Sequence, residues 1–286
     1  MWLPHNSETL VNTTAIENRV KNKEQNYLET FLNPIRKCNS YRPKFGQGNT
    51  KKGLSLNEFK TLYSSDPFYS WIGIDTDQMY ADHRAAGGMT SVYRQIGIGC
   101  ERLFRAVLID ATGYTSAEFA TWSYTAKTRS GKSKTLSLDG RLELSEIKNQ
   151  TVLSNVKNWI KDYCADLDEV TEPANGIVFE VRQGYKSKDS KRQNADIDNA
   201  TVAWANNYLP VFTIFSAQID SDIVLRYRNN RCGILIGTTN SSTQASLYAF
   251  CEQVLGYDLA DFFEHQSTAI KKEIHDILKK LLSAES

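Results

Sequence analysis

Apolar residues follow two different spacings along the chain, and the change of spacing separates predicted strands from predicted helices. Residues 177–181 form a short run of β-branched and aromatic residues, which predicts a buried strand that carries one charged residue, Glu180. The pattern continues with strands at 209–218 and 232–237 and with helices at 189–204 and 221–228. Strands and helices in this alternating order are typical of an α/β fold whose last strands pair in parallel.

Upstream of this region, helical spacing also gives way to strand-like alternation. Thr90 or Ser91 is suited to cap a helix that Gly113 ends. The remaining elements are predicted as a hairpin from 120–128 and 133–144 with a turn at Arg129–Gly131, an amphipathic helix at 151–166, and closing helices at 243–265 and 268–282. Asp139 lies near the far end of the hairpin.

The sequence therefore predicts an α/β fold with a central mixed sheet flanked by helices, preceded by an N-terminal arm that is partly helical and partly irregular. The predicted boundaries are 1–85 for the arm, 86–240 for the core, and 241–286 for C-terminal helices that pack on the core. A chain of 286 residues can bury a core of this size.

Composition narrows the class of protein. A net charge of +1 argues against a protein that coats nucleic acid indiscriminately, although a balanced total can include one basic cleft. The five cysteines are widely separated and lack the paired spacing of a zinc or redox site, which indicates reduced thiols. No secretory leader and no run of about 18 apolar residues is evident, so we expect a soluble cytoplasmic protein.

Charged residues at and after the strand at 177–181 indicate a functional site. An ionised carboxylate such as Glu180 is costly inside an apolar run unless a cation, a proton or a metal compensates it. Between Arg182 and Gln193 the chain carries five basic residues against one acid, Asp189, a surplus that suits a polyanion.

Two carboxylates are candidate ligands for Mg²⁺, which polarises phosphate groups through oxygen ligands. Asp139 and Glu180 are 41 positions apart, so only the fold can bring them together. Asp139 with Gly140 also suits a hairpin turn, and Glu101, in the predicted helix before Gly113, either lies on a solvated flank or reaches toward the site.

Arg182 lies on the same strand face as Glu180, where it contacts a phosphate or the attacking water, or forms a structural ion pair with Glu180. The predicted DNA contacts follow it: phosphates at Lys186, Lys188, Lys191 and Arg192, and base edges at Gln193 and Asn194.

A helix, a hairpin carrying Asp139, the strand FEVR, a helix and a strand together resemble the PD-(D/E)XK nuclease superfamily, especially type II restriction endonucleases, over about residues 88–237. The resemblance implies that Asp139 and Glu180 are the acidic positions and that Arg182 stands at the lysine position. The chain departs from the pattern there, and no proline precedes Asp139. Arginine does not release its proton, so Arg182 has only an electrostatic role, and Lys186 or Lys188 is a substitute for the lysine.

The resemblance implies a type II site-specific deoxyribonuclease of a restriction-modification system, which hydrolyses double-stranded DNA with Mg²⁺ at a short recognition sequence. It also implies a homodimer and a cognate DNA methyltransferase as partner. A nuclease of the same fold in repair or recombination, and a catalytically inactive DNA-binding protein, remain alternatives. A methyltransferase reading of Ser65–Tyr69 fails because the second proline of that signature is missing.

Overall fold

The computed structural model describes residues 7–45, 53–127, 131, 133–167, 170–185 and 190–283. The chain divides into two compact units, one formed by Met1–Val92 with Gln266–Ser286 and the other by Tyr93–His265.

The first unit is helical where the structure describes it. Its elements are α1 (Ser7–Arg36), the 3₁₀ turn η1 (Lys37–Ser40), α2 (Leu56–Ser64), α3 (Pro67–Trp71) and the first part of α4 (Asp77–Thr112). The segment that suggests a methyltransferase signature begins α3, because the Asp66 carboxylate accepts hydrogen bonds from the backbone amides of Phe68 and Tyr69 at 2.9 and 3.3 Å. An aspartate followed by proline is a favourable helix start.

Helix α4 is longer than its sequence pattern predicts. The predicted start at Thr90 or Ser91 is wrong, since the helix begins at Asp77 and continues through Gly87 and Gly88. These glycines permit close packing: a Cβ at Gly88 would lie 2.7 Å from a methyl carbon of Leu281. The predicted end is confirmed, because Gly113 adopts a left-handed φ of +69° directly after the helix.

The second unit contains a four-stranded mixed sheet, in the order β3-β4-β5-β6, among the residues that the structure describes. These strands are β3 (Gly140–Glu143), β4 (Gly176–Arg182), β5 (Tyr208–Ile214) and β6 (Gly233–Ile236). β3 is antiparallel to β4, whereas β4, β5 and β6 are parallel, as the alternating pattern predicts. The predicted hairpin is confirmed as β1 (Trp122–Lys127) paired with β2 (Ser133–Leu138). Its second arm ends at Leu138 and not at Leu144 as predicted, because residues 140–143 form β3 and pair with β4. Arg129 and Ser130 of the predicted turn lie outside the described residues.

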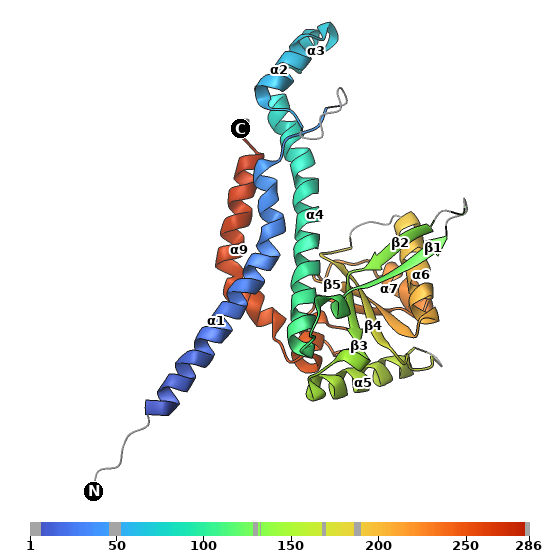
Figure 1. Cartoon of the computed structure of the whole chain (residues 1–286). Helices are drawn as coiled ribbons and strands as arrows, with labels where there is room; N and C mark the ends of the chain where they lie inside the picture. Colours follow the sequence, from blue (N-terminus) through green and yellow to red (C-terminus); the bar gives the residue numbers. More distant parts are fainter. Residues whose placement is uncertain are drawn as a thin grey trace. The chain divides into compact units, whose positions relative to one another are not determined.

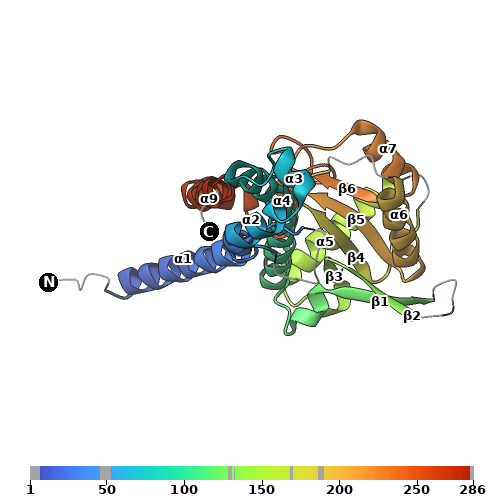
Figure 2. The same cartoon turned by 90° about the horizontal axis from the view of Figure 1, so that it is seen from above.

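Helices flank the sheet, which confirms the α/β class. They are α5 (Gln150–Ala165), α6 (Ser190–Ala205) and α7 (Ser221–Asn229), with short 3₁₀ turns η2 (Ala117–Ala120) and η3 (Leu144–Glu146). α6 and α7 lie side by side against β5 and β6 and bury a cluster that includes Ala200, Phe212 and Tyr227 (Figures 1 and 2). Other contacts join β4 to α4, where Phe179 packs edge-on against Phe104 with ring centroids 5.0 Å apart.

The closing helices differ from the predicted boundaries. Where helices were expected at 243–265 and 268–282, the structure has α8 (Leu247–Ala249), a π-helical turn η4 (Phe250–Val254) and one long helix, α9 (Leu259–Leu281). Gly256, with a φ of +75°, interrupts the first predicted helix. Asp258 then starts α9, because its carboxylate accepts a hydrogen bond from the amide of Asp261 at 2.8 Å.

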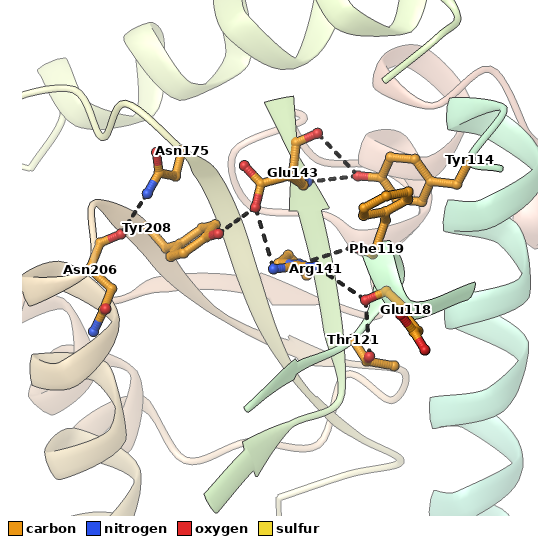
Figure 3. A network of polar contacts seen from close by, with 9 residues as sticks. All are labelled: Tyr114, Glu118, Phe119, Thr121, Arg141, Glu143, Asn175, Asn206 and Tyr208. Carbon is orange, nitrogen blue, oxygen red and sulfur yellow. Dashed lines mark hydrogen bonds and ion pairs between the residues drawn. The ribbon is translucent and has the colours of Figure 1, made fainter. Parts of the chain in front are cut away.

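A polar network joins Glu143, at the end of β3, to Tyr208, at the start of β5 (Figure 3). Glu143 of β3 accepts a hydrogen bond from the hydroxyl of Tyr208 on β5, across Gly176 of the intervening strand. Arg141 donates to the backbone oxygens of Phe119 and Glu118 at 3.0 and 3.1 Å. These polar groups have protein partners, so we assign the network a structural role.

All five cysteines are buried free thiols. In the part of the chain that the structure describes, no helix has the length and apolar character needed to cross a membrane.

Candidate active site

Asp139 lies at the bend where the hairpin joins the main sheet. Its amide donates to the carbonyl of Phe179 at 2.8 Å, and β3 then pairs with β4 from Gly140 onward. Beyond this point β3 no longer covers the edge of β4, and Oδ2 of Asp139 accepts a hydrogen bond from the amide of Val181 at 2.8 Å. The carboxylate therefore satisfies a strand-edge amide with one oxygen.

An arginine from α4 holds the same bend from the helix side. Arg105 donates from Nε and Nη2 to the carbonyl oxygen of Asp139, at 2.9 and 2.7 Å. Nη2 also contacts Oε1 of Glu101 at 2.7 Å, so Glu101 is paired within its own helix. The backbone of Asp139 is thus fixed from both sides, which orients its side chain along the edge of β4.

Glu180 is the partly accessible position in an otherwise buried strand, with 20% of its side chain exposed. The pKa of Glu180 is raised to about 8, first by burial and then by the charge of Asp139, while Arg182 acts to lower it. The pKa of Asp139 is likewise raised to about 6, mainly by burial; the hydrogen bond from the amide of Val181 lowers it, and the charge of Glu101 raises it. The fold thus brings Asp139, Glu180 and Glu101 into one group of interacting acids, in which two buried carboxyl groups resist being ionised together.

Arg182 is buried, with 6% of its side chain exposed. Its Nη2 lies 3.0 Å from Oε1 of Glu180 and 2.6 Å from Oδ1 of Asp196 on α6. The structure therefore contains the ion pair with Glu180 that the strand spacing allowed, and a second pair that is shorter. Nε of Arg182 has no hydrogen-bond partner among the described residues.

Asp196 is a site residue that sequence reasoning missed. Its other oxygen, Oδ2, accepts a hydrogen bond from the hydroxyl of Tyr227 at 2.6 Å, and that hydroxyl lies 2.7 Å from the hydroxyl of Tyr185. The sequence does contain a signal for the burial of Asp196, because Gln193, Asp196 and Ala200 share one face of α6 at helical spacing, and the structure shows that this face is buried. A buried acid on that face requires a cation or donors nearby, but nothing in the sequence indicates Tyr227.

The predicted DNA contacts fall into three groups. Lys186 and Lys188 lie outside the described residues. Lys191 and Arg192 are exposed in the first turn of α6, as is Asn194.

Gln193 is different, since it is only 5% exposed. Arg226 of α7 donates to the side-chain oxygens of Gln193 and Asn194, both at 2.6 Å. The amide of Gln193 is thus engaged inside the protein and not presented to a base edge.

Asp139 and Glu180 offer carboxylate oxygens, which are the ligands that Mg²⁺ prefers. Among the described residues, no group of three or more acidic, histidine or cysteine side chains is arranged to hold a metal ion. Mg²⁺ nevertheless uses one or two protein carboxylates in many sites and completes its shell with water and phosphate oxygens. Asp139 and Glu180 fit that donor set, because their mutual repulsion favours a cation and the described residues supply Asp139 with a donor to Oδ2 alone.

A cavity of about 10 Å³ adjoins Glu180 and Asp196 between the sheet and α6. This volume matches about one water molecule. The cavity thus has space for a single small group beside Glu180, and Asp139 does not line it.

Comparison of the chain with protein-family models, with curated proteins and with solved structures gives no match in any of the three.

Proposed function

We propose that this protein is a Mg²⁺-dependent endodeoxyribonuclease that cuts double-stranded DNA at a short recognition sequence, in the manner of a type II restriction endonuclease. The observation that carries the proposal is the pair of buried, mutually repelling carboxylates, Asp139 and Glu180, at the edge of β4 beyond its pairing with β3. Functional sites concentrate acids whose pKa values are shifted in this way.

Asp139 and Glu180 would hold the cation. When bound, Mg²⁺ neutralises charge on the scissile phosphate and stabilises the oxygen that leaves. The two side chains are suited to this task because the structure fixes them: Asp139 through Val181 and Arg105, and Glu180 through the strand and Arg182. Such fixed geometry limits the reorganisation needed during reaction.

Arg182 acts as a permanent positive charge at the position where the PD-(D/E)XK superfamily carries lysine. A guanidinium does not serve as a base at neutral pH, so its contribution is electrostatic. Asp196 positions Arg182 from the helix side, at 2.6 Å, and Tyr227 in turn holds Asp196. Lys186 and Lys188 stay predictions for a further basic group.

DNA would approach the first turn of α6, where Lys191 and Arg192 are exposed. A helix N-terminus favours phosphate, and exposed basic side chains add attraction that does not depend on base sequence. A homodimer, a cytoplasmic location and a cognate methyltransferase follow from the resemblance to type II enzymes and form part of the proposal.

One observation favours a second candidate, a DNA-binding protein without catalytic activity. Arg182 is paired with Asp196 and Glu180, so its charge is already partly neutralised inside the protein. Such a protein would bind DNA with a steep salt dependence and would leave it uncut.

Digestion of unmethylated phage DNA separates these candidates. The purified protein is incubated with the DNA in Mg²⁺ or in EDTA, and the products are separated by size. Discrete fragments in Mg²⁺ alone support a site-specific endonuclease, whereas retarded but intact DNA supports the binding protein. Cleavage confined to branched or mismatched duplexes would assign the nuclease to repair and contradict the restriction assignment.

A further inference from the structure

A second cavity, of about 720 Å³, lies within the same unit at the C-terminal end of α7. Tyr163 and Leu167 contribute buried side chains to its lining, and Leu225 contributes an exposed one. Arg228 and Arg231 contribute two positive groups to the rim, against the one carboxylate of Asp166. The volume lies within the range of sites for small molecules, about 300–1,000 Å³.

No structural role is evident for the guanidinium groups of Arg228 and Arg231 among the described residues. Both are exposed, and the structure gives neither guanidinium an ion pair or hydrogen bond among the described residues. Arg228 lies in the last turn of α7, where a positive charge also stabilises the helix dipole. Arg231 lies beyond the end of the helix, so that explanation does not extend to it.

Arg231 occupies a position that normally belongs to glycine. The amide of Cys232 donates to the carbonyl of Tyr227 at 3.0 Å, and the amide of Arg231 donates to the carbonyl of Arg228 at 2.8 Å. This is the Schellman pattern of a helix end, whose left-handed residue is usually glycine. Arg231 adopts that conformation with a φ of +57°, although a Cβ is unfavourable there.

The backbone around Arg231 is held in place, since Nε1 of Trp204 donates to its carbonyl oxygen at 3.0 Å. Arg231 thus retains a strained backbone conformation beside a cavity, and such strain indicates that its side chain has a function there. Guanidinium groups match phosphate oxygens in geometry and charge.

We propose that this cavity binds a nucleotide through its phosphate groups. Arg228 and Arg231 hold the phosphates, the side chains of Tyr163 and Leu225 contact the base, and Asp166 accepts hydrogen bonds from the sugar hydroxyls. The phosphate belongs either to a free nucleotide or to a nucleic-acid strand, which share this chemistry. The site uses none of the residues of the proposed nuclease centre and stands independently of that function.

The test is a calorimetric titration of the full-length protein in EDTA, which removes divalent cations from the reaction. ATP is the principal probe, with adenosine, inorganic phosphate and a ten-nucleotide single strand as separate arms. ATP binding assigns the site to a free nucleotide, and binding of the strand alone assigns it to nucleic acid; both support the proposal. Adenosine binding as tightly as ATP, or no binding of either ATP or strand below about 1 mM, overturns it.

Two variants locate the binding. Arg228→Gln and Arg231→Gly should each weaken binding by at least about tenfold, the effect expected for a lost charge-assisted hydrogen bond. Arg231→Gly should unfold at the same temperature as the wild type or higher, because glycine suits the left-handed position. This separates a lost contact from a damaged fold.

Arg94→Gln is the matched control, since Arg94 is an exposed arginine of the same unit that does not line the cavity. Wild-type affinity in this control, with weakened binding in both cavity variants, supports the proposal. Unchanged affinity in both cavity variants contradicts it.

Discussion

At the scale of single residues, the defining feature is a set of charges held inside the protein. Asp139 and Glu180 are acids with raised pKa values, and Arg182 is a buried cation shared between Glu180 and Asp196. Such groups seldom remain in a fold unless they are paired or functional. Arg182 pairs with both Asp196 and Glu180, but Glu180 is also repelled by Asp139, and this repulsion between two buried acids is the reason for assigning the function to Asp139 and Glu180.

The first prediction concerns the pH dependence of stability in EDTA. The folded pKa of Glu180, about 8, lies above its ordinary value of 4.5, so the fold favours the protonated carboxyl. The contribution of Glu180 to the free energy of unfolding is therefore fully present below pH 4.5, its ordinary pKa, and is lost as the pH rises through about 8. The raised pKa of Asp139 has the same effect, since its contribution to stability is lost between pH 3.8 and about pH 6.

Urea unfolding across this pH range measures the effect. The wild type should lose more stability toward alkaline pH than Glu180→Gln, whose amide does not titrate, and Mg²⁺ should restore part of the loss. Parallel pH profiles for the two proteins would rule out the raised pKa of Glu180.

The second prediction concerns Asp196. Asp196→Asn removes the closest charged partner of a buried guanidinium, so the free energy of unfolding should fall by about 3 kcal/mol or more. Tyr227→Phe, which removes one donor to Asp196, should cost about 1–3 kcal/mol. Asp198→Asn, on the exposed face of the same helix, should change stability by less than about 0.5 kcal/mol. Equal effects at Asp196 and Asp198, measured by urea unfolding, would contradict the assigned pairing.

At the scale of elements, the periodic pattern predicts strands and helices of the second unit well. β4, β5 and β6, together with α5, α6 and α7, lie where apolar runs and helical spacing place them. The errors in the predicted helix boundaries occur at glycines. Gly87 and Gly88 suggest a helix boundary but lie inside α4, because a glycine chosen for close packing looks the same in sequence as one chosen for a turn.

The third prediction uses two glycines of α4. Gly97→Ala should raise stability by about 0.5–1 kcal/mol, because alanine favours a helix and the nearest atom to the new Cβ is Cγ of Gln183 at 4.0 Å. Gly88→Ala should lower stability by about 1–3 kcal/mol, because its Cβ would lie 2.7 Å from the buried side chain of Leu281. Thermal unfolding of both variants checks this contrast, and stabilisation by both substitutions would show that Gly88 is not a packing glycine.

At the scale of the whole molecule, the sequence predicts the mixed sheet and its flanking helices but only part of the candidate site. Asp139 and Glu180 were found because each stands out locally, one in a turn and the other in an apolar strand. Asp196 and Tyr227 were not, because their importance depends on which helix faces Arg182. Gln193 was expected at a base edge, yet its side chain is buried against Arg226, a contact between α6 and α7 that no local pattern contains.

The fourth prediction concerns DNA binding by α6. Each contact between a basic side chain and a phosphate releases counterions, so Lys191→Gln and Arg192→Gln should each reduce the slope of log affinity against log salt by about 0.9. Lys157→Gln, which removes an exposed charge from α5, should leave the slope unchanged. Fluorescence anisotropy with a labelled duplex in EDTA measures the slopes, and equal slopes in all four proteins would place the DNA elsewhere.

The central claim is that Asp139 and Glu180 form the catalytic centre of a Mg²⁺-dependent DNA endonuclease, and cleavage of phage DNA by the wild type and Glu180→Gln tests it most directly. Circular dichroism first establishes that both proteins are folded. The account predicts discrete fragments from the wild type in Mg²⁺, none in EDTA, and a rate at least about 100-fold lower for Glu180→Gln, since even indirect partners of a metal contribute 10- to 100-fold. Uncut DNA with the wild type, or equal cutting by the variant, would contradict it.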